Sequence, residues 1–135
     1  MMIYIVAYIA AAVVFCAMDF VWLTIVAKDF YQSHMGHLMA SEPKMGAAVA
    51  FYILFLAGLV FFAVSPALRE QNWLVALGLS AFLGLLAYAS YDLTNLATLK
   101  GWPLSLTLVD IIWGVIVSSA SGTAAYFAVR AFEKM

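Results

Sequence analysis

Three aspartates lie inside stretches of the chain that are otherwise long and apolar: Asp19, Asp92 and Asp110. A carboxylate in hydrocarbon is costly unless it has a partner, water or a proton. A carboxyl group in such a place can exchange a proton with a bound molecule or hold its polar end. We therefore take these three residues as the candidate catalytic residues.

The elements that carry these aspartates are predicted to be membrane-spanning helices, which need ~20 mainly apolar residues. Helices are favoured over barrel strands because the apolar runs are long and lack strict alternation. The first run exceeds the ~7–15 apolar residues of a signal peptide, so we expect it to be retained. The sequence predicts one transmembrane domain over residues 1–135, with spans at about residues 3–27, 45–64, 73–99 and 103–132.

The composition supports a membrane location. Of the 135 residues, 67% are hydrophobic and 10% are charged, whereas soluble domains have about 45–50% and about 25%. The net charge is −1 without a basic run, which argues against nucleic acid as a partner. Membrane lipid and further copies of the chain are the expected partners. The one cysteine, Cys16, excludes an internal disulfide and is expected to be a small buried residue.

The connections predict how the spans are arranged. The connections at residues 66–72 and 100–102 are short, so the spans that they join should be antiparallel neighbours. The connection at residues 28–44 is longer and mixes aromatic, methionine and histidine residues, which fits an interfacial half-helix or a plain surface loop. The predicted fold is an all-α integral membrane protein, an antiparallel four-helix transmembrane bundle with an interfacial first loop. We call the end of the bundle that carries residues 28–44 the loop-one end.

The three aspartates are predicted to lie at one depth. Asp19 lies eight residues before the end of its span, which is about 12 Å from the loop-one end at 1.5 Å per residue. Asp92 lies seven residues before the end of its span and Asp110 seven residues after the start of its own, so each is about 10 Å from the same end. Because no Lys or Arg lies in the middle of a span, we expect the three carboxyl groups to retain or share at least one proton.

Polar and aromatic residues lie within helical reach of the aspartates. Tyr88, Asp92 and Asn95 share a helical face at their three- and four-residue spacing. The pattern Asp-x-x-Trp occurs at Asp19 and again at Asp110, which places each indole on the face of its aspartate, where its N–H can donate to a carboxylate. We predict a pocket that opens toward the loop-one end, and its predicted lining residues are Trp22, Tyr88, Asn95, Thr107 and Trp113.

Other patterns have plainer interpretations. The aspartates can serve as polar contacts between helices, and the small residues Ser118 and Gly122 are typical of close helix packing. Trp73 and Trp102 suit a belt at the membrane interface.

The histidines give little support to a metal site. His34 and His37 have a spacing that with an aspartate could bind a metal. That spacing alone is a weak signal, so we predict no metal, and the sequence indicates no cofactor.

Three segments resemble a family of small bacterial four-span membrane proteins catalogued as domain of unknown function 2177. They are Tyr91-Asp92-Leu93-Thr94-Asn95-Leu96-Ala97-Thr98-Leu99-Lys100-Gly101-Trp102-Pro103, Met18-Asp19-Phe20-Val21-Trp22-Leu23 and Val109-Asp110-Ile111-Ile112-Trp113-Gly114. The resemblance extends over essentially the whole chain and implies a multi-pass protein of the bacterial inner membrane. It implies no established activity.

Three functions are compatible with these patterns. The favoured hypothesis is a protein that binds or modifies a hydrophobic small molecule or lipid, with the aspartates as acid/base groups or headgroup ligands. The second is a proton- or cation-coupled transporter or channel that acts as an oligomer. The third is a non-catalytic subunit or assembly factor of a membrane complex.

Overall fold

The structure, a computed structural model, describes all 135 residues and contains helices without strands. The helices are α1 (Met2–Val21), α2 (Lys28–Met35), α3 (Met45–Leu59), α4 (Ser65–Glu70), α5 (Trp73–Thr98) and α6 (Leu104–Glu133), with π-helical turns at Trp22–Val26 and Val60–Val64 and a 3-10 turn at Gly36–Leu38. Four continuous rods are long and apolar enough to cross a membrane: Met2–Val26, Met45–Glu70, Trp73–Thr98 and Leu104–Glu133. The predicted all-α membrane fold is confirmed.

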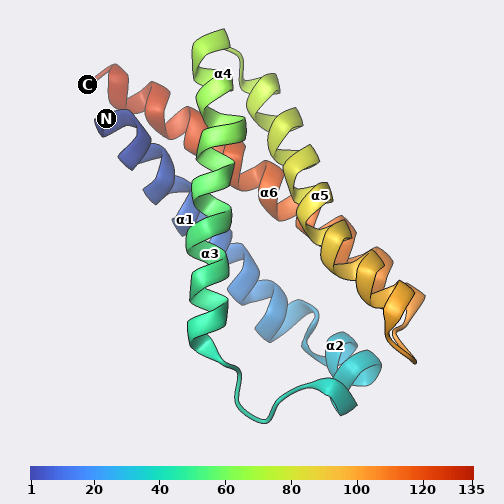
Figure 1. Cartoon of the computed structure of the whole chain (residues 1–135). Helices are drawn as coiled ribbons and strands as arrows, with labels where there is room; N and C mark the ends of the chain where they lie inside the picture. The colour runs from blue at the N-terminus through green and yellow to red at the C-terminus, as the bar shows by residue number, and fades with distance from the viewer.

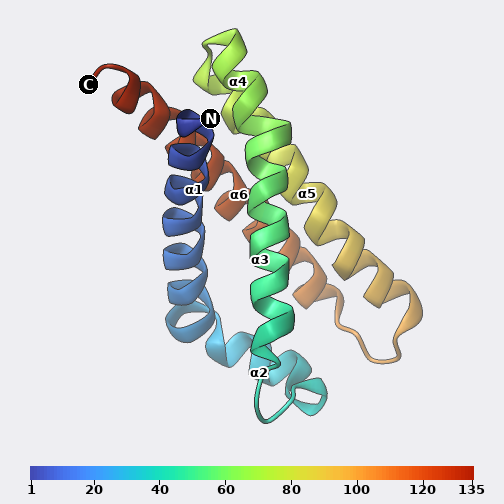
Figure 2. The same cartoon turned by 60° about the vertical axis from the view of Figure 1, so that its left-hand side comes forward.

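The four rods run alternately up and down (Figure 1). The helix α2 and the connection between α5 and α6 lie at one end of the molecule, and both termini lie with α4 at the other end. Figure 2 shows α2 extending from the lower end of α1 toward the lower end of α3. In both views α3 and α5 approach each other near α4 and diverge toward the loop-one end.

The antiparallel helices α5 and α6 pack closely in one register. Small residues allow this approach, because a Cβ atom added at any of three glycines would overlap the facing helix. The facing pairs, one helical turn apart, are Ser80 with Gly122, Gly84 with Ser118, and Tyr88 with Gly114. One further turn in the same register places Asp92 opposite Asp110.

The largest apolar core fills the part of the bundle away from the loop-one end. Its largest fully buried side chains are Phe15, Leu59, Val64, Val117 and Val129. In a bilayer these contacts stabilise the bundle through van der Waals packing. A smaller cluster at the loop-one end consists of Ala27, Tyr31, Trp102 and Leu106.

The second span differs from the prediction at its end. The sequence placed the end at residue 64, before Pro66, but the helical rod continues through this proline to Glu70, and only Gln71 and Asn72 connect it to α5. The π-helical turn at Val60–Val64 ends two residues before Pro66, and such local adjustments let a membrane helix accommodate a residue without an amide hydrogen.

The first connection is helical over Lys28–Met35, which confirms the half-helix alternative for that part. Two other expectations are wrong. Trp102 is only 7% exposed and packs in the cluster at the loop-one end, so it is not a residue of an interfacial belt. Cys16 is exposed on the outer surface of α1, because Phe15 on the neighbouring face occupies the core.

Candidate functional site

Asp19 receives hydrogen bonds from two other helices. The Tyr52 hydroxyl of α3 donates to Asp19 Oδ2, and Trp113 Nε1 of α6 donates to Asp19 Oδ1 over 3.1 Å. Asp19 is 7% exposed, so these donors replace the water that a carboxyl group would otherwise bind. Asp19 thus joins three helices through satisfied polar contacts.

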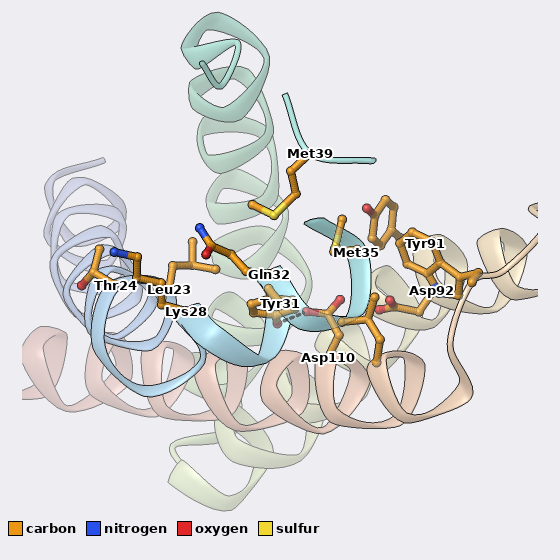
Figure 3. A pocket seen from close by; sticks show the side chains of 12 residues that line it. Leu23, Thr24, Lys28, Tyr31, Gln32, Met35, Met39, Tyr91, Asp92 and Asp110 are labelled. Carbon is orange, nitrogen blue, oxygen red and sulfur yellow. Dashed lines mark hydrogen bonds between the residues drawn. The ribbon is translucent and has the colours of Figure 1, made fainter. Parts of the chain in front are cut away.

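Asp110 accepts a hydrogen bond from the first connection. The Tyr31 hydroxyl of α2 donates to Asp110 Oδ1 over 2.6 Å (Figure 3), and Trp22 Nε1 donates to the Tyr31 hydroxyl oxygen over 3.0 Å. Burial raises the pKa of the Tyr31 phenol, and the neighbouring Asp110 raises it further. The phenol therefore stays protonated and remains a donor. These bonds tie α2 to α6 and to the π-helical turn that follows α1.

The two Asp-x-x-Trp motifs interlock across the antiparallel helices α1 and α6. The rings of Trp22 and Trp113 stack within 4° of parallel, with centroids 4.4 Å apart. The Trp113 indole donates to Asp19, the aspartate of the other motif, and the Trp22 indole donates to the Tyr31 phenol. The carboxylate acceptor expected for an indole is present for Trp113, on the neighbouring helix.

Asp92 differs from the other aspartates because no group of the chain donates to it. The residue is 0% exposed, and neither carboxylate oxygen has a hydrogen-bond partner. Its carboxyl group interacts with that of Asp110, which faces it in the α5–α6 register. A buried polar group without a partner costs about 1–3 kcal/mol, and a charged one costs more. Asp92 is therefore a buried acceptor for which the protein supplies no donor.

A cavity of about 510 Å³ opens at the loop-one end, and we call it the mouth cavity. Asp92 and Asp110 line it together with Lys28 and Tyr31. Figure 3 shows Lys28 and Asp92 on opposite sides of Tyr31. Much of the remaining lining is apolar and includes Met35, whose flexible side chain can adapt to ligands of different shape. The cavity thus carries a cation on one side and two carboxyl groups on the other.

A second cavity of about 500 Å³ lies between α1, α3, α5 and α6, and we call it the lateral cavity. Phe51 is 44% exposed and Tyr91 is 53% exposed, so its rim reaches the outer surface of the bundle between α3 and α5. Its polar lining includes Asp19 and Asp110. Its aromatic lining residues are Trp22, Tyr31, Phe51, Tyr52, Tyr88, Tyr91 and Trp113.

The two cavities share a wall. Leu23, Tyr31, Tyr91 and Asp110 line both of them. The Tyr31–Asp110 hydrogen bond therefore lies at the boundary between a charged space at the loop-one end and an aromatic space that reaches the outer surface of the bundle. One molecule with a polar end and an apolar body could occupy both.

The residues expected in a pocket lie in different surroundings. Trp22, Tyr88 and Trp113 line the lateral cavity, whereas Asn95 and Thr107 line neither cavity. The buried Thr107 hydroxyl donates to the Pro103 carbonyl over 3.1 Å and accepts from Trp102 Nε1 over 3.1 Å. These bonds give Thr107 a role at the start of α6. The three aspartates meet around the shared wall, each on at least one of the cavities.

Tyr31 and Tyr52, which donate to Asp110 and Asp19, were not predicted as partners of the aspartates. Tyr52 is a tyrosine in an otherwise apolar span, and a polar hydroxyl at such a position is a sign of an internal acceptor. Tyr31 gave no comparable sign, because its partner lies 79 residues further along the chain.

The two histidines lie outside both cavities. His34 Nδ1 is 2.8 Å from the Phe30 carbonyl oxygen, and its ring packs on the Phe30 ring with centroids 4.2 Å apart. No group of three or more His, Cys, Asp or Glu side chains is arranged to hold a metal ion.

Comparisons with known proteins give one match. A family model described as "Predicted membrane protein (DUF2177)" matches residues 4–127. No curated protein and no solved structure matches the chain.

Proposed function

The chain belongs to the DUF2177 family of predicted membrane proteins, and we propose that it binds or modifies a hydrophobic small molecule or lipid within the mouth and lateral cavities. We place it in the bacterial inner membrane. The observation that carries the proposal is the shared wall of the two cavities, at which Tyr31 and Asp110 separate a charged space from an aromatic one.

The lateral cavity supports a ligand with an apolar body. Its lining is mainly aromatic and apolar, and its rim at Phe51 and Tyr91 faces the region that hydrocarbon would occupy. Binding sites for small molecules combine such apolar walls with a few placed polar groups. A molecule dissolved in one leaflet could enter between α3 and α5 without crossing water.

The mouth cavity supports a polar end on that ligand. Asp92 and Asp110 lie together on its wall, and Asp19 lies on the lateral cavity next to it. Carboxyl groups so placed can hold a headgroup through hydrogen bonds or exchange a proton with it. We assign Asp92 and Asp110 to direct contact with the ligand and Asp19 to the support of the aromatic wall.

The position of the acids favours a one-sided site over a path across the membrane. The core of the other part of the bundle consists of fully buried apolar side chains, Phe15, Leu59, Val64, Val117 and Val129 among them. A third cavity of about 640 Å³ opens at that end, and its lining includes Tyr4, Tyr8 and Arg69 but no Asp, Glu or His. A proton relay would need such groups in that part as well.

The proposal is tested by native mass spectrometry of protein purified from membranes in a mild detergent. Ala48 lines the lateral cavity, so Ala48→Trp should fill it and reduce the retained lipid or other apolar ligand. The matched control is Ala50→Trp on the exposed side of the same helix, which should retain as much ligand as the wild type. Wild-type protein that carries no ligand, and that no added lipid stabilises against heat, would contradict the proposal.

A further inference from the structure

The α5–α6 packing forces two carboxyl groups to face each other. Tyr88 with Gly114 and Gly84 with Ser118 fix the register, and the next turn brings Asp92 opposite Asp110. Because this register is set by backbone approach at the glycines, the pair cannot separate without unpacking the helices. Facing carboxyl groups need a cation, a proton or external donors between them.

The donors supplied by the chain are unevenly distributed. Asp19 receives two hydrogen bonds, Asp110 receives one from Tyr31, and Asp92 receives none. Asp92 is also 0% exposed and lines the mouth cavity. A proton shared with Asp110 would satisfy one oxygen of the pair, and a donor that enters through this cavity would satisfy the others. A protonated primary amine fits best, because it brings three N–H donors and a positive charge.

A second charged residue in the same cavity indicates which other group the polar end of the ligand carries. Lys28 is the only cationic residue that lines the mouth cavity, and Figure 3 shows it on the far side of Tyr31 from Asp92. Its ammonium group suits a phosphate, which Lys binds as a point charge. The cavity therefore has the charge pattern of a zwitterion, negative toward Lys28 and positive toward Asp92 and Asp110.

We infer that the ligand is an aminophospholipid, with its primary ammonium group between Asp92 and Asp110, its phosphate toward Lys28 and an acyl chain in the lateral cavity. The inference rests on the proposed function and adds the class of headgroup. A choline headgroup carries the same charge but offers no N–H donor, and a glycerol headgroup offers hydroxyl donors without the positive charge. Neither satisfies Asp92 as an ammonium group does.

The test exposes detergent-purified, delipidated protein to equal amounts of phosphatidylethanolamine, phosphatidylcholine and phosphatidylglycerol with matched acyl chains. Native mass spectrometry then measures how much of each is retained. We expect the ethanolamine lipid to exceed each of the others by about tenfold, the effect of one good hydrogen bond to a charged group. Asp92→Asn should abolish this preference, and Asp29→Asn, which removes an acidic charge from an exposed position outside both cavities, should keep it.

The comparison of the three lipids on wild-type protein needs no substitution. It therefore tests the headgroup inference even if Asp92→Asn fails to fold. Equal retention of all three lipids would overturn the headgroup inference and leave the proposed function standing. A preference for the ethanolamine lipid that survives in folded Asp92→Asn would also overturn it. If no lipid of any kind is retained, the proposed function fails together with the inference.

Discussion

Asp19 and Asp92 are both buried carboxyl groups near one end of the same bundle, yet their surroundings are opposite. Asp19 accepts hydrogen bonds from Tyr52 and Trp113, which come from two different helices. Asp92 faces another carboxyl group, that of Asp110, and has no donor. The first arrangement stabilises the fold, whereas the second is costly in the absence of a ligand.

The contrast teaches that burial of an acid in a membrane does not by itself mark a functional site. The informative quantity is the number of donors that the protein supplies to the acid. By that measure we assign Asp19 to the scaffold and Asp92 to the proposed site, and we propose that Asp110 connects the two through Tyr31.

The largest effect is expected where the register that creates the Asp92–Asp110 pair is removed. In Gly84→Val the new side chain would meet the Gly114 carbonyl oxygen, a backbone atom that cannot rotate away. We expect a loss of about 3 kcal/mol in the free energy of unfolding, at the upper end for overpacking. Unfolding by sodium dodecyl sulfate in mixed micelles measures it. The control is Gly78→Val, which has open space around it, and equal losses in both variants would contradict the close register.

The next largest effect is a difference in the free energy of unfolding between variants of Asp19 and Asp92. Asp19→Asn replaces one of the two carboxylate oxygens by an NH₂ group, so either Tyr52 or Trp113 loses its acceptor, and we expect the free energy of unfolding to fall by about 2 kcal/mol. Asp92→Asn replaces a buried carboxyl group that has no donor, so the unfolding free energy of ligand-free protein should stay the same or rise. The same unfolding assay compares the two variants, and a larger loss for Asp92→Asn would reverse the assignment.

A smaller effect on stability is expected at Tyr31, which connects α2 to Asp110 and to Trp22. Tyr31→Phe removes the donor to Asp110 and the acceptor of Trp22, which should cost about 1 kcal/mol and loosen α2. Hydrogen–deuterium exchange should then rise across Lys28–Met35 and remain unchanged in α6. Unchanged exchange in α2 would show that this hydrogen-bond chain does not hold it.

The same variant has a pH signature. An unfolded tyrosine has a pKa of about 10. Burial beside Asp110 raises the pKa of Tyr31 above this unfolded value. Above pH ~10 the unfolded state loses this proton while the folded state keeps it, so stability is full below that pH and falls as the pH rises further. We expect the fall to be shallower in Tyr31→Phe. Parallel pH profiles of wild type and variant would contradict the raised pKa.

The smallest effect is expected at a residue that the sequence placed in the pocket but that lines neither cavity. Asn95→Ala should leave retained ligand within the error of native mass spectrometry, because Asn95 does not reach either lining surface. Asn95 is half-buried, so its replacement should cost no more than about 1 kcal/mol, the contribution of one ordinary hydrogen bond. A clear loss of ligand would extend the site along α5 beyond Asp92.

Much of the fold could be predicted because it depends on local properties. Apolar run lengths predicted the four helices, and chain direction with the helical rise predicted that acids from three spans lie near one end. The error at Pro66 arose because a π-helical turn can carry a membrane helix through a proline, and no residue pattern announces that turn.

The site was less predictable because its partners depend on tertiary contacts. Tyr31 and Tyr52 lie 79 and 33 residues from the aspartates to which they donate. The hydrogen bond from Trp113 of one Asp-x-x-Trp motif to Asp19 of the other follows from the antiparallel packing of α1 and α6, which sequence spacing alone does not set. The Asp92–Asp110 pairing does follow from the glycine and serine spacing, once α5 and α6 are known to be in contact.

The central claim is that Asp92 and Asp110 contact the ligand while Asp19 does not. The direct measurement is solid-state nuclear magnetic resonance of protein with ¹³C-labelled aspartate in bilayers that contain ¹⁵N-labelled phosphatidylethanolamine. We expect ¹⁵N to dephase the carboxyl carbons of Asp92 and Asp110, assigned by their loss in Asp92→Asn and Asp110→Asn, and to leave Asp19 unaffected. Dephasing at Asp19 alone, or at no intramembrane aspartate while the lipid is bound, would contradict it.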